Sequence, residues 1–168
     1  MATEAEAPYS AQHIVRVEEM GRKTIDDLVR EARGRLERLE PRDALAAQRA
    51  GALLIDTRSN DERSRYGVIP GALHIPRSVL EWRLDPDTDS AFRNPNILGL
   101  DQWLVLVCAH GYSTSLAAAT LQEIGFDRAT DVVGGFMAWK GQGLTVHRAP
   151  DVDEAAVPGM GAPDPERP

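Results

Sequence analysis

The segment Trp103-Leu-Val-Leu-Val-Cys-Ala-His-Gly-Tyr-Ser-Thr-Ser115 carries the clearest structural signal in this chain. Residues 103–107 form a continuous apolar run rich in β-branched side chains, which is typical of a strand buried on both faces. A polar, glycine-containing loop follows over residues 108–114, and an Ala/Leu-rich helix is predicted over residues 115–124, ended by Gly125. Strand, loop and helix in this order predict one unit of a parallel α/β sheet.

Apolar runs and helical segments alternate on both sides of this unit. Short strands are predicted over residues 36–39, 52–55, 73–75 and 132–133, and helices over residues 43–50, 77–84 and from 136 to 140. The Arg-rich residues 58–71 and the turn-rich residues 85–101 are predicted to be loops. This alternation predicts an α/β fold whose sheet is mostly parallel.

The two ends of the chain differ in character from the middle. Thr24 is predicted to cap a helix with Asp27 at its third position, and apolar residues follow at helical spacing up to Leu36. This amphipathic helix could dock on the domain or on a partner, and we favour the domain. We therefore expect a loose N-terminus plus helix over residues 1–35, a folded domain over residues 36–147, and a disordered, acidic, Pro-rich tail over residues 148–168.

Composition narrows the class of protein. A chain of 168 residues with 42% hydrophobic and 27% charged residues is expected to be one globular domain. Its formal net charge of −7 argues against nucleic acid and anionic membranes as partners. A single cysteine excludes an internal disulfide and any metal site built from clustered thiolates, so no metal and no cofactor are expected. No secretory leader or membrane-length apolar run is visible, so a cytoplasmic location is expected.

The loop after residue 107 is the candidate for chemistry. Cys108 lies where a predicted strand ends and a helix begins, and a helix N-terminus offers unpaired N–H groups and partial positive charge. Gly111 allows the loop to curl so that several N–H groups converge, and nearby hydroxyls add donors. This setting favours a reactive thiolate over the alternative, a buried cysteine that acts as a small hydrophobe. The predicted anion-binding loop is Ala109, His110, Gly111, Tyr112, Ser113 and Thr114.

Several other side chains have two interpretations each. His110 is either a general base or a solvent-facing residue, and Tyr112 either gates the loop or is simply exposed. Asp56 and Arg58 end a strand at the same predicted edge; we expect a supporting ion pair that holds the loop, with Arg58 facing the anion as the alternative. His74 is expected to be a structural hydrogen-bonding residue. Core packing is expected for Phe136 and Trp139.

Three motifs together resemble a single-domain rhodanese-like protein over about residues 36–147. They are Leu54–Arg58 with Gly67–Pro76, then Cys108–Ala118, and finally Val133–Trp139. The resemblance implies a three-layer α/β/α fold with a mostly parallel, roughly five-stranded sheet. Residues 80–86 are also similar to uncharacterised bacterial members of the family, which suggests an actinobacterial origin.

The resemblance also implies an activity. Cys108 would accept sulfane sulfur from a small anion such as thiosulfate, or from a persulfide, and pass it to cyanide, a thiol or a protein acceptor. The alternatives are a rhodanese-fold binding or regulatory module without turnover, or a redox sensor that needs an external thiol. Ser113 stands where many family members carry Arg, which puts the donor in doubt. Arg128 is the first Arg after the cysteine, so phosphoryl chemistry lacks its usual clamp.

Overall fold

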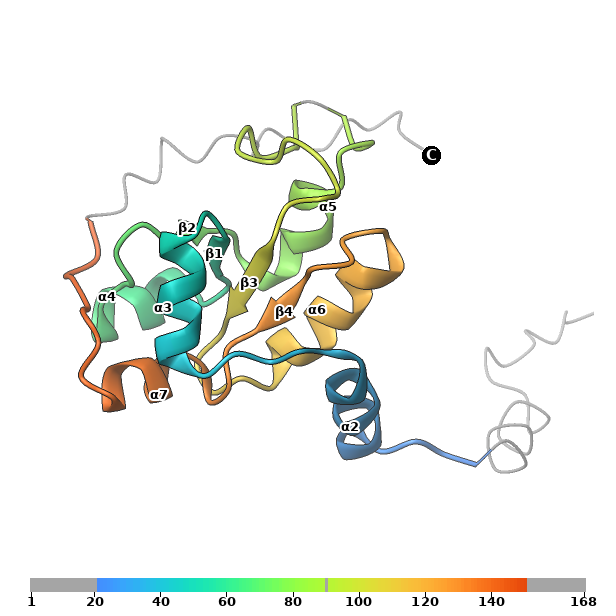
Figure 1. Ribbon diagram of the computed structural model, residues 1–168, viewed down its shortest axis with the longest axis horizontal. Coiled ribbons are helices and arrows are strands. Elements are labelled where there is room, and N and C mark those ends of the chain that lie inside the picture. The colour runs from blue at the N-terminus through green and yellow to red at the C-terminus, as the bar shows by residue number, and fades with distance from the viewer. Residues whose placement is uncertain (1–20, 90, 151–168) are drawn as a thin grey trace, which may run out of the picture.

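The computed structural model describes residues 21–89 and 91–150 of the chain. Helices and strands alternate along it, as Figure 1 shows. In chain order the elements are α2 (Ile25–Arg35), α3 (Pro41–Arg49), β1 (Leu53–Asp56), α4 (Asn60–Tyr66), β2 (Leu73–His74), the 3-10 turn η1 (Arg77–Val79), α5 (Leu80–Leu84), β3 (Leu104–Val107), α6 (Ser113–Glu123), β4 (Thr130–Asp131) and α7 (Gly135–Gly141).

The four strands form one parallel sheet in the order β2-β1-β3-β4. Residues Asp56 of β1 and Val107 of β3 are paired in register, so both strands end at the same edge. Ligands of open parallel sheets gather at the carboxyl ends of the strands. The segment that begins with Cys108 therefore starts at the edge where chemistry is expected.

Helices cover both faces of the sheet, and each face has its own core. On one face, Leu54, Val105 and Val107 pack with side chains of α3 and α7. On the other face, Leu104 and Leu106 pack with side chains of α5 and α6. Successive residues of β3 thus point to opposite sides, and all four are buried, as expected for a central parallel strand. The three-layer α/β/α fold is confirmed (Figure 1).

The sheet has four strands among the described residues instead of the roughly five predicted. The expected strand over residues 36–39 contributes one parallel bridge, between Leu39 and Val132. Pro41 begins α3 directly afterwards, and proline has no N–H to extend a ladder of hydrogen bonds. The last strand also lies two residues earlier than predicted, at Thr130–Asp131.

Two helices differ from the sequence-based expectation. The Arg-rich segment predicted to be a loop contains α4, which begins at a capping box formed by Ser59 and Glu62. Helix α6 begins at Ser113, two residues before the predicted start, so Ser113 and Thr114 lie in its first turn instead of in a loop. The loop that follows β3 is therefore shorter and tighter than predicted.

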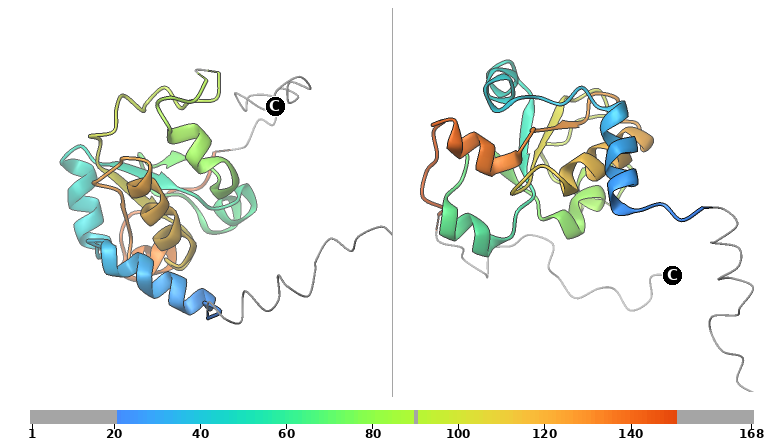
Figure 2. Two further views of the ribbon diagram at one scale, coloured as in Figure 1. Left: turned by 90° about the vertical axis from the view of Figure 1, so that its right-hand side faces the viewer. Right: turned by 90° about the horizontal axis from the view of Figure 1, so that it is seen from below.

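The predicted N-terminal helix is present and packs on the domain. Thr24 and Asp27 form the expected capping box at the start of α2. Helix α2 lies beside α6 (Figure 2). Val29 and Ala32 of α2 are buried, whereas Ile25 and Leu28 are exposed. None of the described helices has the length and apolar character needed to cross a membrane. The expectations for residues 1–20 and for the tail beyond residue 150 lie outside the described residues.

Candidate active site

Cys108 follows β3 directly, and its thiol is buried at the start of α6. Only 8% of the residue is exposed. The N–H of Gly111 donates to Sγ at 3.1 Å, and the hydroxyl of Thr114 lies 3.2 Å from the same atom. Burial raises the pKa of the Cys108 thiol, but hydrogen bonds from Ser113, Thr114 and Gly111 lower that pKa by more, so the net shift is downward. The site therefore favours a thiolate.

Gly111 is required at its position for two reasons. Its φ of +74° lies in the left-handed region, where side chains are strained. A Cβ there would also lie 2.8 Å from the carbonyl oxygen of Val132 and 2.9 Å from the nitrogen of Gly134. The loop can approach the start of α7 this closely only because residue 111 has no side chain.

The start of α7 holds two carbonyl groups of the cysteine loop. The N–H of Phe136 donates to the Cys108 carbonyl at 2.8 Å, and the N–H of Met137 donates to the Ala109 carbonyl at 3.0 Å. In a planar trans peptide the C=O and the N–H point in opposite directions. The N–H groups of these two peptides therefore point away from α7.

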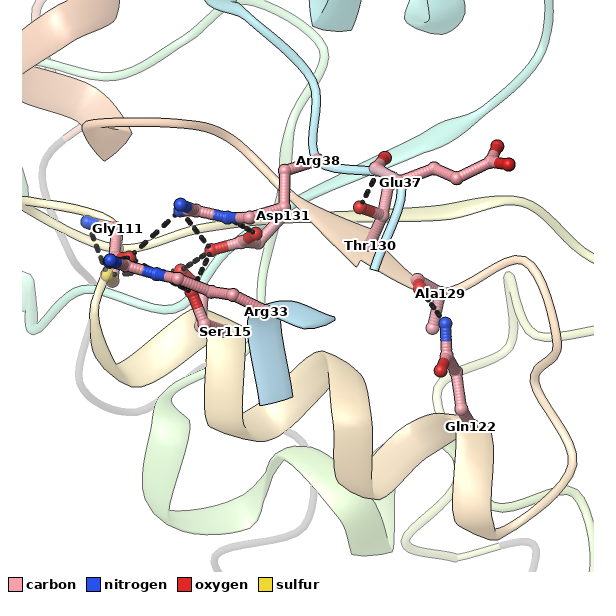
Figure 3. A network of polar contacts seen from close by, with 11 residues as sticks. Arg33, Glu37, Arg38, Gly111, Ser115, Gln122, Ala129, Thr130 and Asp131 are labelled. Atoms are coloured by element: carbon pink, nitrogen blue, oxygen red, sulfur yellow. Dashed lines mark hydrogen bonds and ion pairs between the residues drawn. The ribbon is translucent and has the colours of Figure 1, made fainter. Parts of the chain in front are cut away.

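A polar network behind the loop was missed by the sequence analysis (Figure 3). Asp131 is fully buried and accepts two hydrogen bonds from Arg38, at 2.7 and 3.0 Å. Its carboxylate also accepts from Ser115 at 2.9 Å, and the Thr114 hydroxyl, whose single proton can go either to this carboxylate or to Sγ, lies 3.1 Å away. Arg33 and Arg38 both donate to the carbonyl of Gly111. The available signal was a carboxylate directly before the apolar strand predicted over residues 132–133, because a buried carboxylate requires a cationic or hydrogen-bonding partner.

Asp56 and Arg58 form the predicted ion pair at the end of β1. The Arg58 guanidinium donates to both carboxylate oxygens, at 2.9 and 2.7 Å, and to the Gly67 carbonyl at 2.9 Å. Its remaining nitrogen, Nη1, has no hydrogen-bond partner in the described part of the chain, but the guanidinium lies 3.5 Å from the centre of the buried Phe136 ring. The charge of Arg58 is therefore paired with Asp56, and its side-chain hydrogen bonds go to Asp56 and Gly67 and not to the cysteine loop, so the supporting role stays a prediction.

His74 has the expected structural role. Its Nε2 lies 2.8 Å from the carbonyl oxygen of Arg58, to which it donates. Burial is the main reason that the pKa of His74 is lowered, so the ring stays neutral near pH 7. The core positions predicted for Phe136 and Trp139 are confirmed, with 1% exposure for each residue.

The remaining loop residues face solvent or a shallow cavity. His110 is exposed, and no hydrogen bond joins it to Cys108. Tyr112 is 61% exposed, with the Arg33 guanidinium 5.1 Å from its ring centre. Ser113 is exposed and lines a cavity of about 400 Å³ together with Cys108 and Arg77. In the described residues, no cluster of three or more His, Cys, Asp or Glu side chains is arranged to hold a metal ion.

Comparison with known proteins identifies the family. The model of the rhodanese-like domain matches residues 40–142, which is more than half of the chain. The chain belongs to the rhodanese family. Among curated relatives of this rhodanese, a thiosulfate sulfurtransferase, GlpE, from Stutzerimonas stutzeri is 33% identical over 104 residues, covering 62% of this chain and 84% of that protein. The same-named protein from Actinobacillus succinogenes is 32% identical over 103 residues, covering 61% and 81%.

Solved structures agree with this assignment of the rhodanese fold. A Rhodopseudomonas palustris protein described as a possible tyrosine phosphatase is 31% identical, with a TM-score of 0.68, covering 74% of this chain and 95% of that one. A polysulfide-sulfur transferase from Wolinella succinogenes, 24% identical with a TM-score of 0.57, covers 79% of this chain and 90% of its own and shares the fold. The curated relatives named above come from proteobacteria and leave the expected actinobacterial origin untested.

Proposed function

We propose that this rhodanese transfers sulfane sulfur through a persulfide on Cys108. The observation that carries the proposal is the placement of Sγ at the start of α6, with the Gly111 N–H at 3.1 Å and the Thr114 hydroxyl at 3.2 Å. A persulfide terminus is an anion, and hydrogen-bond donors in a water-poor site stabilise an anion strongly. The relatives named thiosulfate sulfurtransferase support the same conclusion.

The proposed cycle has two steps. The Cys108 thiolate attacks the outer sulfur of thiosulfate, an S–S bond forms at Sγ, and the S–S bond of thiosulfate breaks to release sulfite with its electron pair. A nucleophile such as a thiolate or cyanide then attacks the terminal sulfur, and the Cys108 thiolate leaves. An organic persulfide serves as donor in the same way, with a thiolate as the leaving group.

The cavity beside Sγ is the proposed place of entry for a small sulfur donor. Its volume is about 400 Å³, and it is lined by two guanidinium groups, from Arg58 and Arg77, and by the carboxylate of Glu62. Arg58 is committed to Asp56, whereas Arg77 is 40% exposed and pairs with Glu81 on its own segment. Arg77 is therefore the more accessible of the two guanidinium groups to an incoming donor.

The experiment is sulfur loading of the purified full chain. Incubation with thiosulfate or a persulfide donor is expected to add one sulfur atom to Cys108, as measured by mass spectrometry, and cyanide is expected to remove it as thiocyanate. The Cys108→Ser variant should acquire no sulfur and catalyse no transfer. Wild-type protein that never gains sulfur from either donor, with rates equal to those of Cys108→Ser, would refute the proposal.

The phosphatase and binding-module alternatives have less support. A phosphatase needs a guanidinium clamp for phosphate, but Arg128, the first arginine after Cys108, lies 4.8 Å from the centre of the Trp103 ring. A binding module was favoured partly by the amphipathic helix over residues 25–35. That helix packs its buried face on α6, so this face does not await a partner.

A further inference from the structure

Two arginines of the site lie outside the part of the chain that matches the rhodanese domain. Arg33 is in the last turn of α2 and Arg38 follows that helix, whereas the family match begins at residue 40. Both guanidinium groups reach one atom of the cysteine loop, the carbonyl oxygen of Gly111. Arg33 donates to it at 2.9 Å and Arg38 at 3.1 Å (Figure 3).

The segment that presents these arginines is fixed in place. Leu36 packs in the same core as the buried residues of α6. The hydroxyl of Thr130 donates to the Glu37 carbonyl at 2.8 Å, and the N–H of Leu39 donates to the Asp131 carbonyl at 3.0 Å. The backbone that carries the two guanidinium groups is therefore fixed in place beside the loop.

Each arginine is also oriented by a second contact. Arg38 forms a two-point ion pair with the buried Asp131. Arg33 donates from Nε to the Ser115 hydroxyl at 3.2 Å. The Ser115 hydroxyl lies 3.1 Å from the Gly111 carbonyl and 2.9 Å from the Asp131 carboxylate, so one serine joins both arginines to the loop. Bidentate guanidinium contacts give this arrangement a defined geometry.

The position of the Gly111 carbonyl determines the direction of the next N–H group. Because the peptide is planar and trans, the Tyr112 N–H points opposite to the Gly111 carbonyl and thus away from the two arginines. Charge-assisted hydrogen bonds on a carbonyl also polarise its peptide, which strengthens the N–H as a donor. Two other carbonyls of the same loop, those of Cys108 and Ala109, are held by backbone N–H groups of α7.

We propose that Arg33 and Arg38 are positioning residues for sulfur transfer, holding the Gly111–Tyr112 peptide so that its N–H faces the sulfur carried by Cys108. This inference rests on the proposed function. It makes the N-terminal helix a working part of the active site, although that helix lies outside the family match. The two arginines do not touch the sulfur; they act through the peptide that they hold.

Arg33 offers the sharper test because Arg38 also neutralises a buried carboxylate, and its loss would threaten folding. In the full chain, Arg33→Ala is expected to slow sulfur loading of Cys108 roughly three- to tenfold, the effect of losing about one hydrogen bond. The midpoint of Cys108 alkylation against pH should move upward in the same variant. Arg33→Lys keeps the positive charge but loses the two-point geometry of the guanidinium group. Its loading rate and alkylation midpoint should therefore lie between those of the wild type and Arg33→Ala.

Arg35→Ala is the matched control, because Arg35 lies on the same helix and pairs with the exposed Glu123. It should leave the loading rate and the alkylation midpoint at wild-type values. If Arg33→Ala behaves like Arg35→Ala in both measurements, the positioning role is wrong. If Arg33→Ala is only less stable, it will unfold at a lower denaturant concentration while the alkylation midpoint of the folded protein stays at the wild-type value. That result would also contradict the proposal.

The two proposals fail separately. Absence of sulfur loading in the wild type overturns the sulfurtransferase proposal, while the alkylation midpoint still tests whether Arg33 acts on the loop. If the wild type loads sulfur normally and Arg33→Ala has the same loading rate and the same alkylation midpoint, only the positioning role is overturned. If Arg33→Ala does not fold, Arg33→Lys carries the test, and wild-type values for both of its measurements contradict the proposal.

Discussion

Two opposing influences act on the thiol of Cys108. Its burial disfavours the charged form, and the donors supplied by Gly111, Ser113 and Thr114 favour it. The donors prevail, and they belong to a short loop and to the first turn of a helix; within the described part of the chain, the hydrogen bonds that reach the sulfur come from uncharged groups. The charged groups Arg33, Arg38 and Asp131 thus contact the loop and not the sulfur, and the hydrogen bonds to Sγ come from uncharged groups.

This balance predicts the pH dependence of alkylation. A thiolate reacts and a thiol does not, so the rate should rise with pH to a midpoint below the ordinary thiol pKa of about 8.5. Thr114→Val removes one donor and should raise the midpoint by roughly 0.5–1 pH unit, the effect of one ordinary hydrogen bond. Thr120→Val is the control, since that hydroxyl bonds to a helix carbonyl farther along α6. A wild-type midpoint at or above 8.5 would contradict the proposed anion site.

Ser113 predicts a donor preference. It lines the same cavity as Cys108, so Ser113→Arg would place a second guanidinium near Arg77 at the entrance. We expect roughly a tenfold fall in the half-saturating concentration of thiosulfate, reflecting part of one charge-assisted hydrogen bond. The gain should shrink with added salt, because the entrance is exposed.

An uncharged organic polysulfide is the control for this variant. It should gain nothing from the added charge. Equal improvement for both donors, or for neither, would mean that charge at position 113 does not govern donor choice.

The first turn of helix α7 lies against the cysteine loop, and Gly135 allows this close approach. Gly135 has a φ of +60°, and a Cβ on it would lie 2.7 Å from the Gly111 nitrogen and in contact with the Cys108 carbonyl. The distance between the end of β3 and the start of α7 is thus set by the absence of a side chain at one position.

Gly135→Ala is therefore expected to lower the free energy of unfolding by at least about 1–2 kcal/mol, the cost of a left-handed alanine before any clash is counted. Gly141→Ala, in the last turn of the same helix, meets nothing within 4 Å and has no left-handed φ, so it should stay within about 1 kcal/mol of wild type. Denaturant titration compares the two. Equal stabilities for the two variants would rule out the close approach of α7 to the loop.

The elements with strong local signals were predictable from the sequence. The buried strand at residues 104–107 and the capping box at Thr24 follow from periodicity and cap chemistry, and the structure confirms both. Helix α4 also had such a signal, Ser59 with Glu62, but its charged surface hid the periodicity. The strand predicted over residues 36–39 contributes only the bridge at Leu39, because the short segment Leu36-Glu-Arg-Leu39 does not reveal where its partner strand ends.

The site was predictable only in part, for a physical reason. Cys108 and its loop form one continuous segment, so their chemistry could be read from neighbouring residues. Arg33, Arg38 and Asp131 meet only through the fold, across 73 to 93 residues of chain. The sequence pattern around an arginine is the same whether its side chain faces solvent or bonds to a loop carbonyl.

The molecule as a whole predicts which parts of the chain sulfur transfer requires. Every site contact described above joins residues between 33 and 137, whereas residues 1–20 and 151–168 contain no cysteine. Deletion of both segments should leave the rate of sulfur transfer within about twofold, since composition predicts no buried core for them. Ala149 is 9% exposed, so the cut belongs after residue 150 and not after residue 147, where the sequence alone places the end of the domain.

Kinetic assay of the shortened protein beside the full chain makes this comparison. A shortened protein that unfolds like the full chain in denaturant but transfers no sulfur would contradict the prediction.

The long sequence separations within the site also bear on how the protein is made. Residue 33 leaves the ribosome early, Cys108 much later, and the α7 N–H groups that hold its loop come from residues 136 and 137. Chains are synthesised from the N-terminus, and contacts between distant residues form only once both partners are present. A nascent chain that has exposed its cysteine but not yet α7 therefore carries an ordinary thiol. Reactivity beyond that of an ordinary thiol is thus expected only once the last quarter of the polypeptide has been made, so a translation product that ends before α7 should react with sulfur donors no faster than a free cysteine.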